Sequence, residues 1–350
     1  MNYTDYLNQK RYLCLDGLRC LSILAVIWHH AGYPYWDHIY LASQGFHGVT
    51  LFFVISGFLI TSLLLKEKRT KGQIDLKHFY IRRTLRIFPL YYCVLLIYIL
   101  LVFVLESGTP AGTAFLDNLK YFATYTSNVF VPFIAGDRII FFFAWSLAAE
   151  EQFYLIWPTI ERMLVPIISI PLLILIIIAS TYLHYTGINS ENLFFKALEI
   201  IAIPICIGVV LAHALANKKC YQFIAPLITR PGASLIFLIA TFASLAINGV
   251  PLILVYILMA LLIASCVTSP RPIISPLFEH YVAKKIGQIS YGMYLLHMLA
   301  YNLVAKIVTH LNIDYWPITF SATIALTTLL GLSSFYLFER HFLKLKKNFS

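Results

Sequence analysis

Ten apolar stretches, each close to the length that crosses a bilayer, constrain this chain more than any other feature. A transmembrane helix needs about 20 mostly apolar residues. The chain has only 12% charged residues and a mean hydropathy of +0.78, whereas a soluble domain typically has about 25% charged residues. The expected spans are 14–33, 47–66, 86–105, 147–165, 166–185, 193–214, 232–247, 250–267, 288–309 and 317–339. We therefore predict an all-α polytopic membrane protein of about ten transmembrane helices, with residues 1–350 forming a single integral-membrane domain.

The distribution of lysine and arginine predicts the orientation of these spans. With the N-terminus in the cytoplasm, most of the 26 basic residues fall in inner segments, whereas the outer loops hold only Lys120 and Arg138. Because basic residues concentrate on the cytoplasmic side of membrane proteins, both termini are predicted to be cytoplasmic. This topology accounts for most of the net charge of +10, so we expect no nucleic-acid partner.

Ionisable residues within the span 14–33 indicate a functional site, because charges inside a membrane are costly and usually face a bundle interior or a wet cavity. Arg19 and His30 are about three helical turns apart and therefore share a face, whereas His29 points about 100° away from His30. A neutral imidazole can act as a general base toward a hydroxyl. The alternative is that both residues are only structural, and that each forms its polar contacts with a neighbouring helix.

Three arginines, Arg82, Arg83 and Arg86, lie where the chain enters the span 86–105. Arg83 and Arg86 are one turn apart and can converge on one anion, and guanidinium groups bind phosphates well. The pattern predicts a docking site for a cytoplasmic donor that carries phosphate. The alternative is an anchor that only sets the topology.

Two carboxylates, Glu150 and Glu151, begin the span 147–165 at its outer side. Glu150 is expected at the depth of His30, where a carboxylate could orient the imidazole; a helix-dipole role is the alternative. His297 lies in the middle of the span 288–309 and suits a structural or a functional role equally. Glu339 is expected to pair with an inner arginine.

Two further segments have distinctive sequences. Ser56 and Gly57 place small residues in the middle of the span 47–66, which suits close helix packing or a binding role. The outer segment 106–146 is long and semi-apolar, and loops of this length are uncommon unless they are functional. A re-entrant path through the membrane is one interpretation, and it requires that protein or a wet cavity covers the backbone.

Four ordered motifs resemble the membrane-bound acyltransferase family 3, the bacterial surface-glycan O-acyltransferases. The family pattern L-D-G-L-R followed by a histidine is similar to Leu15–Arg19 with His30. The other three matches are Gly48–Ile60, Arg82–Tyr91 and Trp145–Pro158. The sequence departs from the family pattern at Cys20, Thr50, Ala148 and His341.

The resemblance implies transfer of an acyl group, acetyl being favoured, from acyl-CoA to a hydroxyl of an envelope glycan or glycolipid at the bacterial inner membrane. It implies a stand-alone form without a C-terminal esterase-like domain, and no metal or tightly bound cofactor. The residues expected to act in catalysis are His30 and Glu150. Those expected to bind the donor or the substrate are Arg19, Arg82, Arg83, Arg86, Trp145, Ser56 and His297.

Alternatives remain open for both mechanism and class. His30 could act as a general base or carry the acyl group transiently. A transporter or flippase for lipid-linked sugars would also place polar residues near the midplane, although the sequence shows no inverted repeat. A protein that only binds and senses its ligand is a third interpretation. Transfer or hydrolysis of acyl-CoA would distinguish an enzyme from both.

Overall fold

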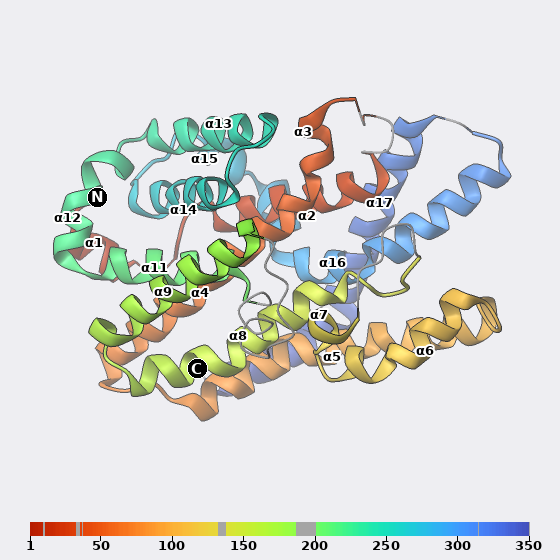
Figure 1. Cartoon of the computed structure of the whole chain (residues 1–350), viewed down its shortest axis with the longest axis horizontal. Helices are drawn as coiled ribbons and strands as arrows, with labels where there is room; N and C mark the ends of the chain where they lie inside the picture. The colour runs from red at the N-terminus through yellow and green to blue at the C-terminus, as the bar shows by residue number, and fades with distance from the viewer. Residues whose placement is uncertain are drawn as a thin grey trace. The chain divides into compact units, whose positions relative to one another are not determined.

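The computed structural model describes residues 1–9, 11–32, 36, 38–131, 138–186, 201–313 and 315–349. Throughout these residues the regular secondary structure is helical and contains no strand, so the predicted all-α class is confirmed (Figure 1). The chain forms two compact units, the first made of Met1–Gly72 and Pro204–Ser333, the second of Gln73–Ile203 and Ser334–Ser350. Each unit is described by itself.

The first unit is built around α2 (Leu15–Ala31), which packs along α16 (Tyr281–His310) and against α4 (His47–Lys71). Helices α13 (Ala233–Ala246) and α14 (Leu252–Thr268) form an antiparallel pair (Figure 1). The remaining elements are α1 (Tyr3–Asn8), α3 (Tyr40–Ser43), the short 3-10 helix η2 (Gln44–Phe46), α11 (Ile203–Ala216), α12 (Lys218–Ile228), α15 (Ser275–Phe278) and α17 (Trp316–Ser334).

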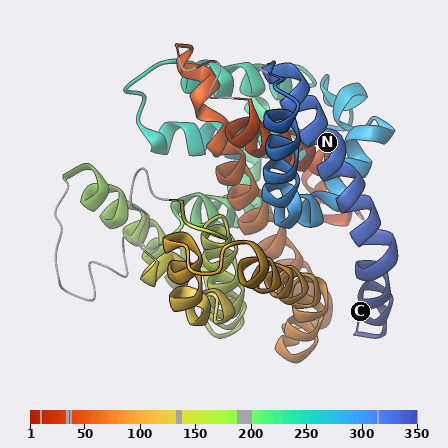
Figure 2. The ribbon, with the colours of Figure 1, turned by 90° about the vertical axis from the view of Figure 1, so that its right-hand side faces the viewer.

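The second unit is organised around the long helix α5 (Leu76–Leu105). Helix α6 (Pro110–Ala123) lies beside α5 in both views of the ribbon (Figures 1 and 2). The other elements are α7 (Ser127–Phe130), α8 (Ala144–Met163), α9 (Pro166–Thr186), the π-helix η3 (Phe335–Glu339), α18 (Arg340–Leu345) and the 3-10 helix η4 (Lys346–Phe349). Packing on α5 brings η3, α18 and η4, the last part of the chain, against residues that are far earlier in the sequence.

Two helices are longer than the apolar spans that predicted them. Helix α4 continues to Lys71 and α5 begins at Leu76, so most of the interval 67–85 between the expected spans 47–66 and 86–105 is helical and not a loop. Gly72 ends α4 with φ of +79°, a left-handed conformation that suits glycine, and the Asp75 side chain accepts a hydrogen bond from the His78 N–H at the start of α5. The expected spans are located from apolar residues alone. They therefore leave out the last turns of α4 and the first turns of α5, which are rich in basic residues.

Every expected span coincides with a helix in the described residues, except that residue 33 of the span 14–33 and residues 193–200 of the span 193–214 lie outside them. Within the part of the chain that the structure describes, four helical segments are long and apolar enough to cross a membrane by length and composition, or up to five if α11 and α12, bent by 104°, form one span. The other helices are shorter or carry charges, as in α8. Membrane-helix character is thus supported, whereas the ten-span count and its orientation stay predictions.

Candidate functional site

Helices α2 and α16 cross closely at Gly287. A Cβ atom at this position would lie 1.7 Å from the carbonyl oxygen of Asp16, so only glycine permits the contact. Further along both helices, the rings of His30 and His297 meet with 5.1 Å between their centroids. Because residue numbers rise in the same direction along both helices, α2 and α16 run parallel.

Asp16 is the centre of a polar network at the start of α2. Its carboxylate lies 3.0 Å from Arg11 Nη2 and 3.5 Å from Arg19 Nη1, and it accepts a hydrogen bond of 3.5 Å from the Gln288 amide of α16. Glu279 also contributes at this end, since it accepts a 2.5 Å hydrogen bond from the Cys14 N–H. Arg19 is therefore held by a carboxylate on its own helix.

The histidines occupy the other end of the α2–α16 contact. His297 is 1% exposed, and its Nδ1 lies 2.5 Å from the Tyr294 carbonyl oxygen. Because a carbonyl can only accept, His297 Nδ1 carries the hydrogen of this bond. The bond and the burial fix the ring of His297, and that ring in turn bounds the space beside the half-buried His30.

His29 faces a different element from His30 but remains near it. Its ring packs on Phe46 of η2 with 5.9 Å between centroids, and Gly45 approaches the same turn of α2 so closely that an added Cβ would lie 3.0 Å from His29 Cβ. The ring centroids of His29 and His30 are only 5.1 Å apart. The angle of about 100° between the two side chains therefore gives His29 a different packing partner from His30, but the two rings remain close to each other.

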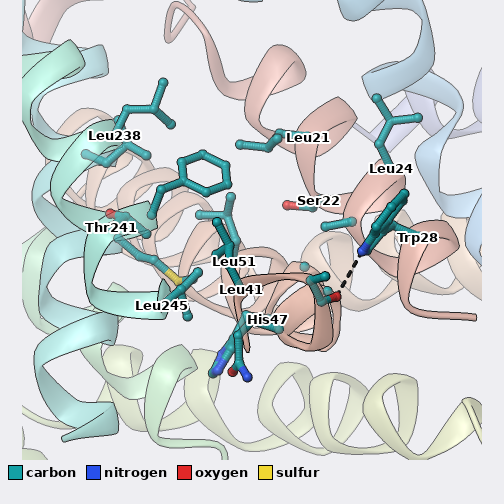
Figure 3. Close-up of a pocket in the computed structure, with 18 of the residues that line it drawn as sticks. Leu21, Ser22, Leu24, Trp28, Leu41, His47, Leu51, Leu238, Thr241 and Leu245 are labelled. Atoms are coloured by element: carbon teal, nitrogen blue, oxygen red, sulfur yellow. Dashed lines mark hydrogen bonds between the residues drawn. The ribbon is translucent and has the colours of Figure 1, made fainter. Parts of the chain in front are cut away.

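An apolar pocket of about 500 Å³ lies on the α4 side of α2 within the first unit. Leu21, Ser22 and Trp28 of α2 face Leu238, Thr241 and Leu245 of α13 across it (Figure 3). The Trp28 indole N–H donates a 2.9 Å hydrogen bond to the Ala42 carbonyl oxygen at its edge. The pocket is lined by the face of α2 that carries Ser22 and Ala25, and neither His30 nor His297 is part of that lining.

The second unit links Arg83 to Glu150 through Tyr154. The Arg83 guanidinium lies over the Tyr154 ring at 5.1 Å and the Phe79 ring at 5.7 Å from their centroids. The Tyr154 hydroxyl donates a hydrogen bond to Glu150 Oε1. Arg83 also lies within electrostatic range of both Glu150 and Glu151. Tyr154 was not among the predicted residues, although its spacing of four from Glu150 places both on one helix face.

The three arginines at the start of α5 have different partners. Arg82 Nη1 donates a 2.7 Å hydrogen bond to the Phe349 carbonyl oxygen of η4. Arg86 lies within electrostatic range of Glu339, whose carboxylate also accepts a 3.0 Å hydrogen bond from the Ser334 hydroxyl. All three arginines nevertheless lie within electrostatic range of the same side chain, that of Lys346 in η4.

Residues within or next to the family motifs, none of them proposed as site residues, hold the segment 106–146. The hydroxyls of Tyr91 and Tyr92 donate to the carbonyl oxygens of Phe122 and Ala123 at the end of α6, at 2.7 and 2.9 Å. Gln152 of α8 donates to the Tyr125 carbonyl oxygen at 2.8 Å and pairs with the Asn128 amide. The described part of this segment therefore contains α6 and α7, and side chains tie it to α5 and α8.

The other predicted residues lie within helices. Ser56 is half-buried on α4 beside Gly57, where an added Cβ would lie 2.0 Å from the Ile205 carbonyl oxygen; close packing thus accounts for the glycine. Trp145 is half-buried in the first turn of α8. Within the described ranges, no group of three or more His, Cys, Asp or Glu side chains could hold a metal ion.

Apolar helices that carry ionisable side chains are the features expected of a helical, membrane-type protein with a functional site. Residues 12–332 match the family described as "Acyltransferase domain". The chain belongs to this acyltransferase 3 family, which confirms the membership that the motifs predicted.

Several curated proteins are similar to the chain. Peptidoglycan O-acetyltransferase OatA of Listeria monocytogenes is 27% identical over 90% of this chain and 53% of its own length. A Staphylococcus aureus (strain COL) protein, provisionally named an O-acetyltransferase, is 29% identical over 86% of this chain and 52% of its own length. The chain thus spans about half the length of these relatives. No solved structure matches it significantly.

Proposed function

We propose that this protein is an integral-membrane O-acyltransferase that moves an acyl group, acetyl being favoured, from cytoplasmic acyl-CoA to a hydroxyl of an envelope glycan. Membership of the acyltransferase family carries the proposal. Because a matched relative is named as a peptidoglycan O-acetyltransferase, peptidoglycan is the first acceptor to test. The bacterial inner membrane is the proposed location.

His30 is the proposed catalytic residue of the first unit. As a general base, it takes the proton of the acceptor hydroxyl while the hydroxyl oxygen attacks the thioester carbonyl and the thiolate of CoA leaves. As an acyl carrier, its nitrogen attacks the thioester carbonyl and expels the thiolate of CoA. The acceptor hydroxyl oxygen then attacks the acyl carbon, the nitrogen–acyl bond breaks, and the hydroxyl proton passes to the freed imidazole nitrogen. Both routes use a neutral ring, and His297 supports the ring of His30 by direct contact.

The donor is proposed to bind through its phosphates at the start of α5 in the second unit, where Arg83 and Arg86 are supported by aromatic faces and by Glu339. Glu150 accepts a hydrogen bond from Tyr154 and would thereby fix the orientation of the Tyr154 ring over which Arg83 lies. Arg19, Ser56 and Trp145 remain proposed binding residues, and the role of Glu150 toward His30 remains a proposal too.

The test is transfer of radiolabelled acetyl from acetyl-CoA to peptidoglycan fragments by the purified protein in lipid nanodiscs. An enzyme of this class transfers label or slowly hydrolyses acetyl-CoA, whereas a transporter or flippase for lipid-linked sugars does neither. Label retained on the protein without an acceptor would identify the acyl-carrier route. If neither transfer nor hydrolysis occurs with acetyl-CoA or other acyl-CoA donors, the proposed function is wrong.

A second measurement examines the donor site alone. Arg86→Lys keeps the charge but loses the planar guanidinium fork, so CoA should bind more weakly while the fold stays intact. The double variant Arg83→Ala with Arg86→Ala should bind CoA more weakly still. An unchanged affinity in the double variant would mean that these arginines only anchor the topology.

A further inference from the structure

The last segment of the chain approaches the arginines of α5. Helix α18 and η4 both pack on α5. Arg82 donates to the Phe349 carbonyl oxygen at 2.7 Å, and the Phe349 ring lies 5.9 Å from the ring of His78, one turn before Arg82. These contacts, at two positions of α5, place η4 alongside its first turns.

This packing brings a fourth cation to the arginines. Lys346, the first residue of η4, is half-buried, and Arg86, Arg83 and Arg82 all oppose its charge. Burial first, and then the three arginines, lower the pKa of Lys346 to about 8. Cations that face one another in a partly buried place are unfavourable unless an anion joins them. Glu339 already faces Arg86, and Glu150 and Glu151 face Arg83. A ligand with several negative charges would add to this compensation for the four groups together.

The chemistry of the four groups suits a polyphosphate. Arginine presents a planar fork that can bind two phosphate oxygens, whereas lysine acts as a compact point charge on a flexible stem. Three arginines on one helix and one lysine from another segment can therefore approach a phosphate chain from two sides.

We propose that Lys346, carried by η4, completes a phosphate-binding site with Arg82, Arg83 and Arg86, and that it binds the phosphates of the acyl-CoA donor. The inference rests on the proposed function and adds to it a donor-binding residue from outside the four motifs. The α18–η4 segment is then part of the donor site rather than a cytoplasmic tail that only sets topology.

The experiment measures direct binding of CoA to the full chain in phosphatidylcholine nanodiscs, by calorimetry, with no acceptor present. Lys346→Gln should weaken CoA binding about tenfold, which corresponds to about 1.4 kcal/mol, because the variant loses a charged hydrogen-bond donor to a phosphate. Lys346→Arg should bind CoA nearly as well as the natural protein. Lys344→Gln is the matched control, because Lys344 is exposed on the neighbouring helix α18, and its affinity should not change.

A phosphate-free donor provides the second arm. Acetyl-pantetheine carries the thioester without the phosphates, so its transfer rate should be the same in Lys346→Gln and in the natural protein. An equal loss of rate with both donors would mean that Lys346 supports the fold rather than the phosphates, and the inference would be wrong.

The remaining outcomes separate the inference from the proposed function. If the natural protein does not bind CoA, the proposed donor is wrong and the inference fails with it. If the natural protein binds CoA and Lys346→Gln binds it equally well, only the inference is wrong. If Lys346→Gln leaves CoA binding unchanged but abolishes a stabilising effect of phosphatidylglycerol on thermal unfolding, the site takes a lipid headgroup instead.

Discussion

At the scale of single residues, the catalytic role proposed for His30 depends on the two histidine rings next to it. The ring of His297 contacts it from α16, and the ring of His29 contacts it from its own helix. Since His297 is 1% exposed and bonded to the Tyr294 carbonyl oxygen, it is a rigid support. His29 instead packs toward Phe46. The two neighbours of His30 are therefore expected to differ in their effects on activity.

Replacing His30 tests its catalytic role. His30→Ala should lower the rate of glycan acylation by about 10² to 10⁴, the usual contribution of a general acid or base, at normal membrane level. His29→Ala is the matched control and should lose only a few-fold, because its ring faces η2. The measurement is acetyl transfer per amount of membrane protein. Equal losses of activity in both variants would contradict the different roles expected of His30 and His29. A loss of only a few-fold in His30→Ala would mean that His30 only shapes the cavity.

The pKa of Lys346 gives the donor site a pH dependence. Arg82, Arg83 and Arg86 face this lysine from α5, and Glu339 faces Arg86 from η3. With a pKa of about 8, lowered from 10.5, the ammonium loses its proton as pH rises from 7 to 9. CoA affinity should therefore fall over this interval. Lys346→Arg should remove the fall, since a guanidinium stays protonated there. Calorimetric titrations at several pH values would check this, and identical pH profiles in the two proteins would contradict it.

At the scale of elements, the contact of α2 with α16 sets the geometry of the first unit. Gly287 lets the helices meet at Asp16, and the parallel course of the two helices then brings His297 to His30. Gly48 has a similar function between α4 and α2, since an added Cβ there would lie 2.3 Å from the Ser22 carbonyl oxygen. Helix α2 is thus held between two partners by glycines.

Gly287→Ala should disturb this contact, because backbone atoms cannot yield as a flexible side chain can. Overpacking of this kind typically costs about 1–3 kcal/mol. We expect a lower midpoint of thermal unfolding in detergent and a loss of acyl transfer. Gly232→Ala is the control, since its added Cβ would meet no atom closer than 3.9 Å. A Gly287→Ala protein as stable and active as the Gly232→Ala protein would show that the helices separate without consequence.

At the scale of the whole molecule, length and charge both decide which expected spans meet the criterion for crossing a membrane: α2 has only 17 residues, whereas α8 has 20 residues but carries several charges. Helix α2 carries Asp16 and Arg19, and α8 carries Glu150 and Glu151. Charged groups in a membrane bundle usually turn inward and pair, as Arg19 does with Asp16 and Glu150 does with Tyr154. Such helices suit the interior of a bundle despite their low apolarity, and the ten-span count stays a prediction.

Reporter fusions test that prediction. Fusions after Ser350 and within 72–75, between α4 and α5, should read as cytoplasmic, because basic residues flank both positions. A fusion near Asn189, which lies outside the described residues, should read as external. An external reading after Ser350 would exclude ten spans that begin inside.

The sequence alone was sufficient for features that depend on neighbours along the chain. Apolar length located the helices, and the family motifs identified the acyltransferase family. It misplaced the start of α5, because the cap at Asp75 and the basic turns after it are not apolar. For 106–146 it predicted only a long outer segment, re-entrant in one interpretation; the described part of this segment contains α6 and α7, which Tyr91 and Gln152 contact from other helices.

The tertiary structure decided which distant residues meet. His297 beside His30, Gly287 beside Asp16, and Lys346 among the arginines of α5 each join residues far apart in the chain. A helical period of 3.6 residues says which residues share a face, but it contains no information about which other helix covers that face. That choice follows from side-chain size at the crossing points, where glycine permits contact, and from the pairing of buried charges, which exist only once the chain is packed.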